Sequence, residues 1–176
     1  MIVNSLRNPA LNSLINPMVN AQINPLVNGS INPNVNGLIN PNVNGSINPS
    51  VNGSINPIIN GSINPNVNGS INPNVNGAIN PNYNTALNPN YTASINGYYI
   101  HPWGTVDFAG FAVRATAQVV LIFNMKMQWC SVGIMACPGI VVLFDLTMTW
   151  VGMWVSNGAG NYSIYGRSMN LTGYTS

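Results

Sequence analysis

The segment Val27–Asn34 reads Val-Asn-Gly-Ser-Ile-Asn-Pro-Asn, and related octads fill residues 3–98 twelve times over. Asn occupies every fourth position of this array, with Thr92 as the exception. The residue before each of these positions is apolar or Tyr except at Arg7. Pro follows one Asn of every octad but the last, and Gly follows the other Asn in the central copies. The repeating unit is therefore a tetrad, apolar-Asn-(Pro or Gly)-x.

A sequence period of four excludes the common repetitive structures. A helix does not accommodate Pro at every second turn, collagen requires Gly at every third residue, and a flat strand has a period of two. Asn-Pro-Asn and Asn-Gly are turn sequences, because Asn hydrogen-bonds its own backbone, Pro fixes φ and Gly tolerates positive φ. We therefore expect a turn every four residues, with Ile or Val pointing inward and Asn stacked on Asn. This predicts a β-turn-rich shaft or a narrow β-solenoid.

Two kinds of shaft satisfy the alternation of Pro and Gly. A solenoid with sixteen residues per coil would make six coils, about 29 Å long at the usual strand spacing. Extended copies from several chains could instead wrap around one another, with a length approaching about 290 Å. The sequence leaves both alternatives open.

The composition restricts the class of protein. The chain has 176 residues but only six fully charged side chains, or 3%, whereas Asn occurs 33 times. Ordinary soluble domains have roughly 25% charged residues, so an ordinary cytosolic enzyme is disfavoured. Four cations and a net charge of +2 are too few for nucleic-acid binding. The hydrophobic content of 46% disfavours simple disorder. What remains is a neutral, repetitive chain, typical of fibrous and assembly proteins.

The C-terminal residues 98–176 have a different pattern. They hold all four Trp residues, both Cys residues and five of the six charges. Apolar residues alternate with polar ones over residues 111–129 and again over residues 140–154. This period of two predicts two strands. Residues 105–108 and 161–174 are expected to add further strands.

The two long strands match as an antiparallel hairpin when Cys130 lies opposite Cys137. In this register the apolar faces coincide, and a shift by one residue would destroy the match. The turn then falls within residues 131–136, and the two cysteines could form a disulfide. Two buried free thiols are the alternative.

A small single sheet with one very apolar face cannot bury that face alone. The polar shaft is not expected to cover it, so we predict homo-oligomerisation, with a trimer as the first choice. The fold class is then all-β: a tandem octapeptide shaft or solenoid followed by a small antiparallel β domain that closes by homo-oligomerisation. The predicted oligomer core consists of Leu121, Phe123, Phe144, Leu146, Trp150 and Trp154.

The array divides the chain into three regions: divergent N-terminal repeats (1–26), the regular shaft (27–97) and the C-terminal β domain (98–176). The first region is more apolar than the central repeats and is either a cap or a docking end for another subunit or an anchor protein. The residues expected to dock are Ile2, Val3, Leu6, Leu11, Leu14 and Met18.

Glycosylation sequons recur within the repeat, where Asn is followed by Gly-Ser. The start of the sequence lacks the pattern of a signal peptide, so these sequons are expected to be turn residues that arise from the repeat. The candidate positions are Asn28, Asn44, Asn52, Asn60 and Asn68.

Catalysis has little support in the sequence. The chain has one histidine, His101, two Asp residues and no Glu, and no nucleophile motif surrounds them. His101 is expected to be a packed or hydrogen-bonded structural residue. One His with two Cys is too few for a zinc site, and no Lys follows the glycines to make a phosphate-binding loop. We expect no enzymatic activity, no cofactor and no metal.

These features predict a structural subunit of an extracellular fibre, filament or surface appendage, whose main partner is a further copy of itself. A stalk of repeats with a compact β head resembles viral and phage fibres and spore-surface filaments in architecture. A receptor- or surface-binding fibre tip is the first alternative. An ice-binding solenoid and an oligomeric hairpin pore or membrane anchor are further alternatives, although a membrane location is disfavoured because Pro138 and Gly139 interrupt the longest uncharged stretch.

Overall fold

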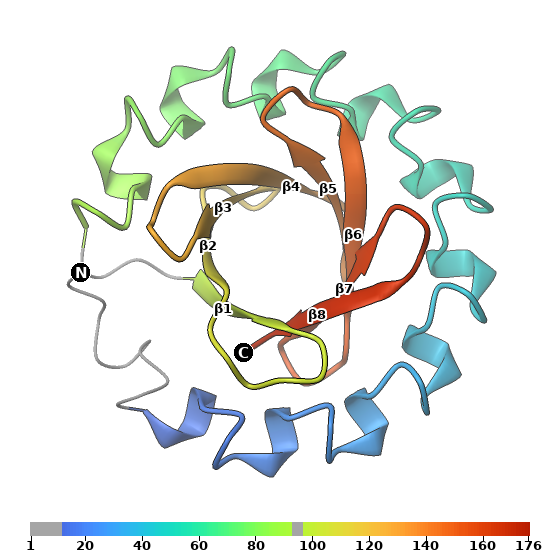
Figure 1. The fold of residues 1–176 in the computed structure, drawn as a ribbon. Helices are drawn as coiled ribbons and strands as arrows, with labels where there is room; N and C mark the ends of the chain where they lie inside the picture. Colours follow the sequence, from blue (N-terminus) through green and yellow to red (C-terminus); the bar gives the residue numbers. More distant parts are fainter. Residues whose placement is uncertain (1–11, 93–96) are drawn as a thin grey trace.

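The computed structural model describes residues 12–92 and 97–176. The protein is all-β, with eight antiparallel strands that close into a barrel (Figure 1). Residues 12–92, here called the belt, run around the outside of this barrel as a chain of short turns. The strands are β1 (Gly97–Pro102), β2 (Gly110–Arg114), β3 (Val119–Asn124), β4 (Trp129–Cys137), β5 (Ile140–Asp145), β6 (Trp150–Ser156), β7 (Tyr162–Gly166) and β8 (Leu171–Thr175).

Each octad of the belt contains two right-handed turns joined by extended Asn residues. One turn is a short 3-10 helix, such as η8 (Gly61–Ile63), whose flanking residues Asn60 and Asn64 have ψ of 96° and 111°. The other follows Pro and closes with a bond from the Asn68 amide nitrogen to the Asn64 carbonyl oxygen at 2.8 Å. The 3-10 helices are η2 (Ser13–Ile15), η3 (Ala21–Ile23), η4 (Gly29–Ile31), η5 (Gly37–Ile39), η6 (Gly45–Ile47), η7 (Gly53–Ile55), η8, η9 (Gly69–Ile71), η10 (Gly77–Ile79) and η11 (Thr85–Leu87).

Asn side chains connect successive turns of the belt. The Asn72 side-chain oxygen accepts from the Asn74 amide at 2.9 Å, which caps the turn that follows. Its side-chain nitrogen donates to the Pro65 carbonyl oxygen at 2.9 Å, in the preceding octad. Asn68 makes the same two kinds of bond, to Ser70 and Ser62. The Asn repeat therefore satisfies turn ends that would otherwise need water or charged caps.

The two apolar positions of the octad point in opposite directions. The residue that ends the 3-10 helix is Ile in all but η11, and in the central octads it faces the barrel and the Pro two residues later is buried as well, as Ile63 and Pro65 illustrate. The Val position faces outward, and Val67 is 71% exposed. The prediction that both Ile and Val point inward is therefore correct only for Ile.

Gly has a different role in the belt from the predicted one. The described glycines with positive φ lie outside the belt, so the Asn-Gly turns do not need a left-handed residue. Instead, a Cβ atom on Gly61 would lie 3.1 Å from a methyl carbon of Val67. Gly thus leaves room for the Val side chain of the next turn, and Ala21 and Thr85 occupy the same phase elsewhere.

The barrel consists of four hairpins with a 21-residue repeat. Residues 123–129 read Phe-Asn-Met-Lys-Met-Gln-Trp, and residues 144–150 read Phe-Asp-Leu-Thr-Met-Thr-Trp. Residues 165–171 follow the same outline. Each of these segments is a tight turn with a register shift at its first residue, as expected for a type I turn followed by a bulge. Three hairpins of the barrel are therefore structural copies of one another.

A methionine in the left-handed region occupies the same place in each of these turns. Met127, Met148 and Met169 have φ of 56°, 61° and 59°, and they are the non-glycine residues with positive φ in the described parts of the chain. Such a conformation costs about 1–2 kcal/mol for a side-chain-bearing residue. All three side chains are buried at the belt–barrel boundary, with 3–5% of their surface exposed. Their burial offsets the backbone strain.

The belt and the barrel meet in a fixed register at these methionines. The carbonyl oxygens of Met169, Met148 and Met127 accept hydrogen bonds from the side chains of Asn42, Asn66 and Asn90, each at 2.8 Å. The three Asn residues are 24 residues apart, and the methionines are 21 residues apart. Three octads therefore span one hairpin, and the belt runs around the barrel in the order opposite to the hairpins.

The main hydrophobic core lies between the belt and the outer face of the barrel. It joins Ile55, Ile63, Ile71 and Ile79 of the belt to outward-facing strand residues such as Leu121 and Val132. The alternate strand residues fill the lumen of the barrel in a second, smaller cluster: Ala112, Val120, Ile122, Val141, Leu143, Trp154 and Tyr162. Belt and barrel thus share one core.

This arrangement differs from the predicted shaft and oligomer. The described repeats follow the barrel instead of extending away from it, and they contain no strand (Figure 1). The prediction rested on the assumption that the polar repeats cannot cover an apolar sheet. Because Ile and Pro share one side of the belt, the repeats do cover it. The sheet also closes on itself, so neither exposed edges nor the apolar face requires a second chain.

The predicted long hairpin does not form. Residues 111–129 contain β2, β3 and the first residue of β4, and residues 131–136 lie in the middle of β4. Phe123 pairs with Phe111 and Trp129, whereas the predicted register, with Cys130 opposite Cys137, would place it opposite Phe144. Some of the polar residues that suggested a solvent-facing side of a strand instead cap turns. Asn124, for example, accepts bonds from the Lys126 and Gln128 amides.

The inward and outward positions of the belt predict different sensitivities to substitution. Ile63→Ala should lower the free energy of unfolding by about 2–4 kcal/mol, because Ile63 is 2% exposed within the shared core. Val67→Ala should change it by about 0.5 kcal/mol or less, because Val67 is 71% exposed. Denaturant unfolding of both variants measures the difference. Equal effects would contradict the arrangement of belt on barrel.

Candidate functional site

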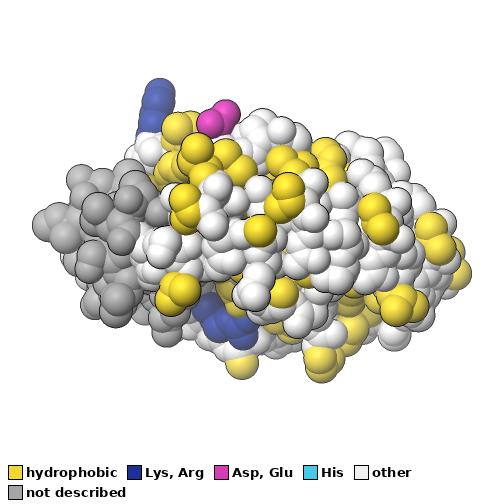
Figure 2. All heavy atoms as spheres, turned by 90° about the horizontal axis from the view of Figure 1, so that it is seen from below, with side chains coloured by type: hydrophobic (Ala, Val, Ile, Leu, Met, Phe, Trp, Pro, Cys, Tyr) yellow, Lys and Arg dark blue, Asp and Glu magenta, His cyan; other side chains and the backbone are white. Residues whose placement is uncertain are grey.

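The outer face of the belt carries an apolar residue once per octad. These side chains are 65–80% exposed, and they point away from the barrel. In Figure 2 hydrophobic side chains appear as separate spots among uncharged polar atoms on the viewed face. We call this set the outer stripe. It comprises Val19, Val27, Val35, Val43, Val51, Ile59, Val67, Val75, Tyr83 and Tyr91.

The predicted docking end is described only in part. Leu14 and Met18 are 74% and 71% exposed at the start of the described belt, so they are available for contact. Ile2, Val3, Leu6 and Leu11 lie outside the described residues.

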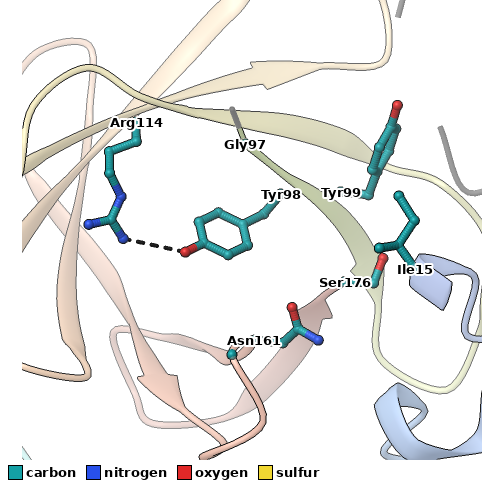
Figure 3. Close-up of a pocket in the computed structure, with 8 residues that line it drawn as sticks. Ile15, Gly97, Tyr98, Tyr99, Arg114, Asn161 and Ser176 are labelled. Carbon is teal, nitrogen blue, oxygen red and sulfur yellow. Dashed lines mark hydrogen bonds between the residues drawn. The ribbon is translucent and has the colours of Figure 1, made fainter. Parts of the chain in front are cut away.

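A pocket lies at the end of the barrel away from the tight turns. It has a cavity volume of about 330 Å³. Figure 3 shows Arg114 at the end of β2 reaching toward Tyr98 of β1, with Asn161 and Ser176 on another side. The lining residues are Ile15, Gly97, Tyr98, Tyr99, Arg114, Gly160, Asn161 and Ser176.

Aromatic rings hold one wall of this pocket in place. The ring of Tyr98 packs edge-on against Trp154 and Tyr162, with centroid separations of 6.3 and 5.5 Å. Arg114 donates a hydrogen bond to the Tyr98 hydroxyl at 3.3 Å, and this bond raises the pKa of Arg114. Burial raises the pKa of Tyr162. The charged guanidinium therefore lies beside tyrosine side chains and not beside a carboxylate.

The charges of the chain are distributed unevenly along the barrel axis. Asp107 lies in the β1–β2 loop and Asp145 at the end of β5, both at the end with the tight turns. Arg114 lies at the opposite end, where it has no acidic side chain of the described residues beside it. Arg114 is not among the site residues predicted from the sequence.

His101 is buried in a hydrogen-bonded position next to Ser176. Its Nδ1 donates to the carbonyl oxygens of Val106 and Asp107 at 3.2 and 3.0 Å, so its Nε2 accepts from the Ser176 hydroxyl at 2.8 Å. The ring stacks on Tyr174 with centroids 4.9 Å apart. Burial lowers the pKa of His101, and its bonds to the carbonyl oxygens act in the opposite direction.

This histidine differs from the base of a hydrolytic triad. Backbone carbonyls orient the imidazole, whereas a triad uses a carboxylate that stabilises the imidazolium. His101 is 2% exposed and Ser176 is 7% exposed, so a substrate has little access to the pair. The geometry matches the structural histidine that the sequence predicted.

Other site chemistry is sparse in the described parts of the chain. Residues 12–92 and 97–176 contain no group of three or more His, Cys, Asp or Glu side chains that could hold a metal ion. Within the same residues, no helix has the length and apolarity needed to cross a membrane.

The predicted disulfide does not form. Cys130 and Cys137 are free thiols near the two ends of β4. Seven residue steps along the strand separate their Cα atoms by about 23 Å, whereas a disulfide requires Cα atoms within about 7 Å. The prediction failed because it placed a turn where the chain continues as a strand.

The predicted oligomer core is distributed over three environments within one chain. Leu121, Phe123, Phe144 and Trp150 belong to the core beneath the belt, and Trp154 lies in the lumen. Leu146 is 39% exposed in a tight turn, where its carbonyl oxygen accepts from Asn74. The structure therefore brings most of these residues together without a second subunit.

The sequon side chains are engaged in the belt. Each side-chain nitrogen donates to the carbonyl oxygen six residues earlier, at 2.6–2.9 Å. A glycan on this nitrogen would disturb the bond between turns. The residues concerned are Asn28, Asn44, Asn52, Asn60 and Asn68.

Comparison with protein-family models, with curated proteins and with solved structures found no match for this chain.

The buried His101 predicts a specific dependence of stability on pH. Because its folded pKa lies below the ordinary value of 6.5, the unfolded chain binds more protons in this range. The contribution of neutral His101 to the free energy of unfolding is fully present above about pH 6.5. It is lost as the pH falls from there toward the pKa of His101 in the folded protein. The free energy of unfolding should therefore decrease from pH 7 to pH 5, by at most about 1.4 kcal/mol per pH unit.

His101→Gln provides the control, because the chain has no other histidine and no Glu. Denaturant unfolding at several pH values should show a weaker slope between pH 7 and pH 5 for this variant than for the parent protein. A parent protein with no slope, or a variant with an unchanged slope, would contradict the assignment.

The free cysteines predict stability that does not depend on reducing agent. Burial raises the pKa of both Cys130 and Cys137, which lowers their reactivity as thiolates. Mass spectrometry after alkylation of the unfolded protein should find both thiols modified without prior reduction. The melting temperature should be the same with and without dithiothreitol. An intramolecular disulfide in the native protein would contradict the described position of β4.

Proposed function

We propose that this chain is a non-enzymatic structural subunit of an extracellular fibre, filament or surface appendage, and that it associates with further copies of itself through the outer stripe. The single observation that carries the proposal is the regular exposure of one apolar residue per octad on the outer face of the belt. Scattered exposed apolar residues are normal on protein surfaces. A set that recurs every eight residues around the circumference is a patterned surface and indicates a contact role.

The low charge of the chain supports this function. With six charged side chains and a net charge of +2, copies would repel one another only weakly. The side chains of the outer stripe recur eight residues apart, with polar residues between them. Each contact between two convex belts would then be small, and assembly would depend on many such contacts. This mode of association suits an ordered array better than a tight dimer.

The location and the anchor are parts of the same proposal. The exposed Leu14 and Met18 support a docking role for the N-terminal repeats, with an anchor protein or a neighbouring subunit as partner. Placement at a cell or particle surface rests on the composition.

The convex belt is a poor match for the flat ladder that an ice-binding surface requires. The outer face of the barrel is covered by the belt and its lumen holds apolar side chains, which weakens the support for a pore.

A surface-binding fibre tip is a second candidate function. The pocket with Arg114 at one end of the barrel favours it, since mouths of barrels commonly hold ligands.

Assembly should depend on concentration and on the outer stripe. Val43, Val51 and Val67 are 71–72% exposed, and their replacement by Thr keeps the branched shape while it makes the surface polar. The triple variant should retain the melting temperature and require about tenfold or more protein to assemble. Sedimentation velocity and negative-stain electron microscopy measure the association.

Ser50→Ala is the matched control, because Ser50 is exposed on the belt outside the stripe. It should assemble like the parent protein. A parent protein that stays monomeric at millimolar concentration would overturn the proposed self-association. Equal assembly of the parent protein and the triple variant would exclude the outer stripe as the contact surface.

A further inference from the structure

The pocket at the open end of the barrel is built from segments distant in the sequence. Tyr98 comes from β1, Arg114 from the end of β2 and Asn161 from the β6–β7 loop. Ile15 contributes from the belt. The closed sheet fixes these strand ends, so the pocket is formed before any ligand arrives.

Arg114 gives the pocket a positive charge, and no acidic side chain of the described residues lines it. Both Asp residues lie at the other end of the barrel, and the hydrogen bond of Arg114 goes to a phenol. Lys126 and Arg167 lie at that other end too, in the β3–β4 and β7–β8 turns, so a single cation of the described residues lines this pocket. One guanidinium fork matches one planar carboxylate, whereas a phosphate dianion usually binds several cations.

The remaining lining groups are neutral and of two kinds. Tyr98 offers part of its ring surface, while the Asn161 amide can form hydrogen bonds. Gly160 has φ of +86°, a conformation that L side chains rarely adopt, and it borders the cavity next to Asn161. A sugar ring has the complementary features, because its C–H face packs on aromatic rings and its hydroxyl edge pairs with polar groups.

We propose that this pocket binds an acidic sugar unit, with the carboxylate on Arg114 and the sugar hydroxyls against Asn161. A cavity of about 330 Å³ lies at the lower end of the usual range for ligand pockets and suits a single sugar unit. The inference names a ligand class for the fibre-tip function and rests on that second candidate, not on self-association.

The test is a calorimetric or NMR titration of the full chain with glucuronate, and with glucose as its uncharged analogue. Glucuronate should bind in the millimolar range, and glucose should bind about tenfold or more weakly, because it lacks the charge-assisted bond. Arg114→Gln should lower the affinity for glucuronate about tenfold or more. Arg114→Lys should keep part of it, since the charge remains without the fork.

Lys126→Gln is the matched control, because it removes the same charge at the opposite end of the barrel. It should bind glucuronate like the parent protein. Circular dichroism establishes whether each variant is folded. If Arg114→Gln does not fold, Arg114→Lys tests the contribution of the guanidinium group instead. The inference is overturned if glucuronate does not bind, if glucose binds equally well, or if Lys126→Gln loses the same affinity. Binding of inorganic sulfate without binding of glucuronate would also overturn it. Glucuronate binding by a chain that does not assemble would separate this inference from self-association.

Discussion

The amide side chain of Asn is the group on which the structure depends. It offers an acceptor and two donors at once, without charge. In the belt the oxygen caps one turn while the nitrogen bonds the carbonyl of a preceding turn, as Asn72 does with Asn74 and Pro65. Asp would supply only acceptors, and Ser would not reach across a turn. The four-residue spacing of Asn therefore determines how the chain coils.

A second set of Asn amides fixes the position of the belt relative to the barrel. Asn42, Asn66 and Asn90 bond the carbonyl oxygens of the strained methionines, so three octads are matched to each 21-residue hairpin. A belt of isolated turns has no core of its own, and the outer face of the barrel is apolar. Each part therefore buries the surface of the other. The sequence boundary near residue 97 separates two patterns that share one hydrophobic core.

Part of this fold could be predicted from the sequence, and the reasons for the failures are physical. The turn every four residues and the all-β C-terminal region follow from local chemistry, since Pro, Asn and alternating apolar residues act within a few positions. The direction of Val67 does not follow, because Ile and Val are equally apolar and only the barrel distinguishes them. The long hairpin failed because the turns around Asn124 and Thr116 preserve the alternation of apolar residues across them. The 21-residue repeat of Phe123–Trp129 in Phe144–Trp150 was the available signal for four hairpins.

The candidate sites were harder to predict because they form only when the eight strands close into a barrel. Arg114 and Asn161 are distant in the sequence, and the closed sheet brings them to one end of the barrel. His101 was assigned a structural role from its isolation among few titratable residues, and its contacts with Val106 and Ser176 agree with that role.

The apolar residues of the outer stripe have two possible explanations, packing within the belt and contact with other molecules. Val packs over the Gly of the preceding turn, as Val43 does over Gly37, so some of these residues could serve the belt itself. At Gly77, however, a Cβ atom would meet nothing within 4 Å, although Tyr83 occupies the corresponding outer position and is 80% exposed. The apolar character of the stripe thus persists where the contact with Gly is lost. Contact with Gly77 does not account for an aromatic residue at position 83, whereas the proposed role of the outer face in contacts between molecules would.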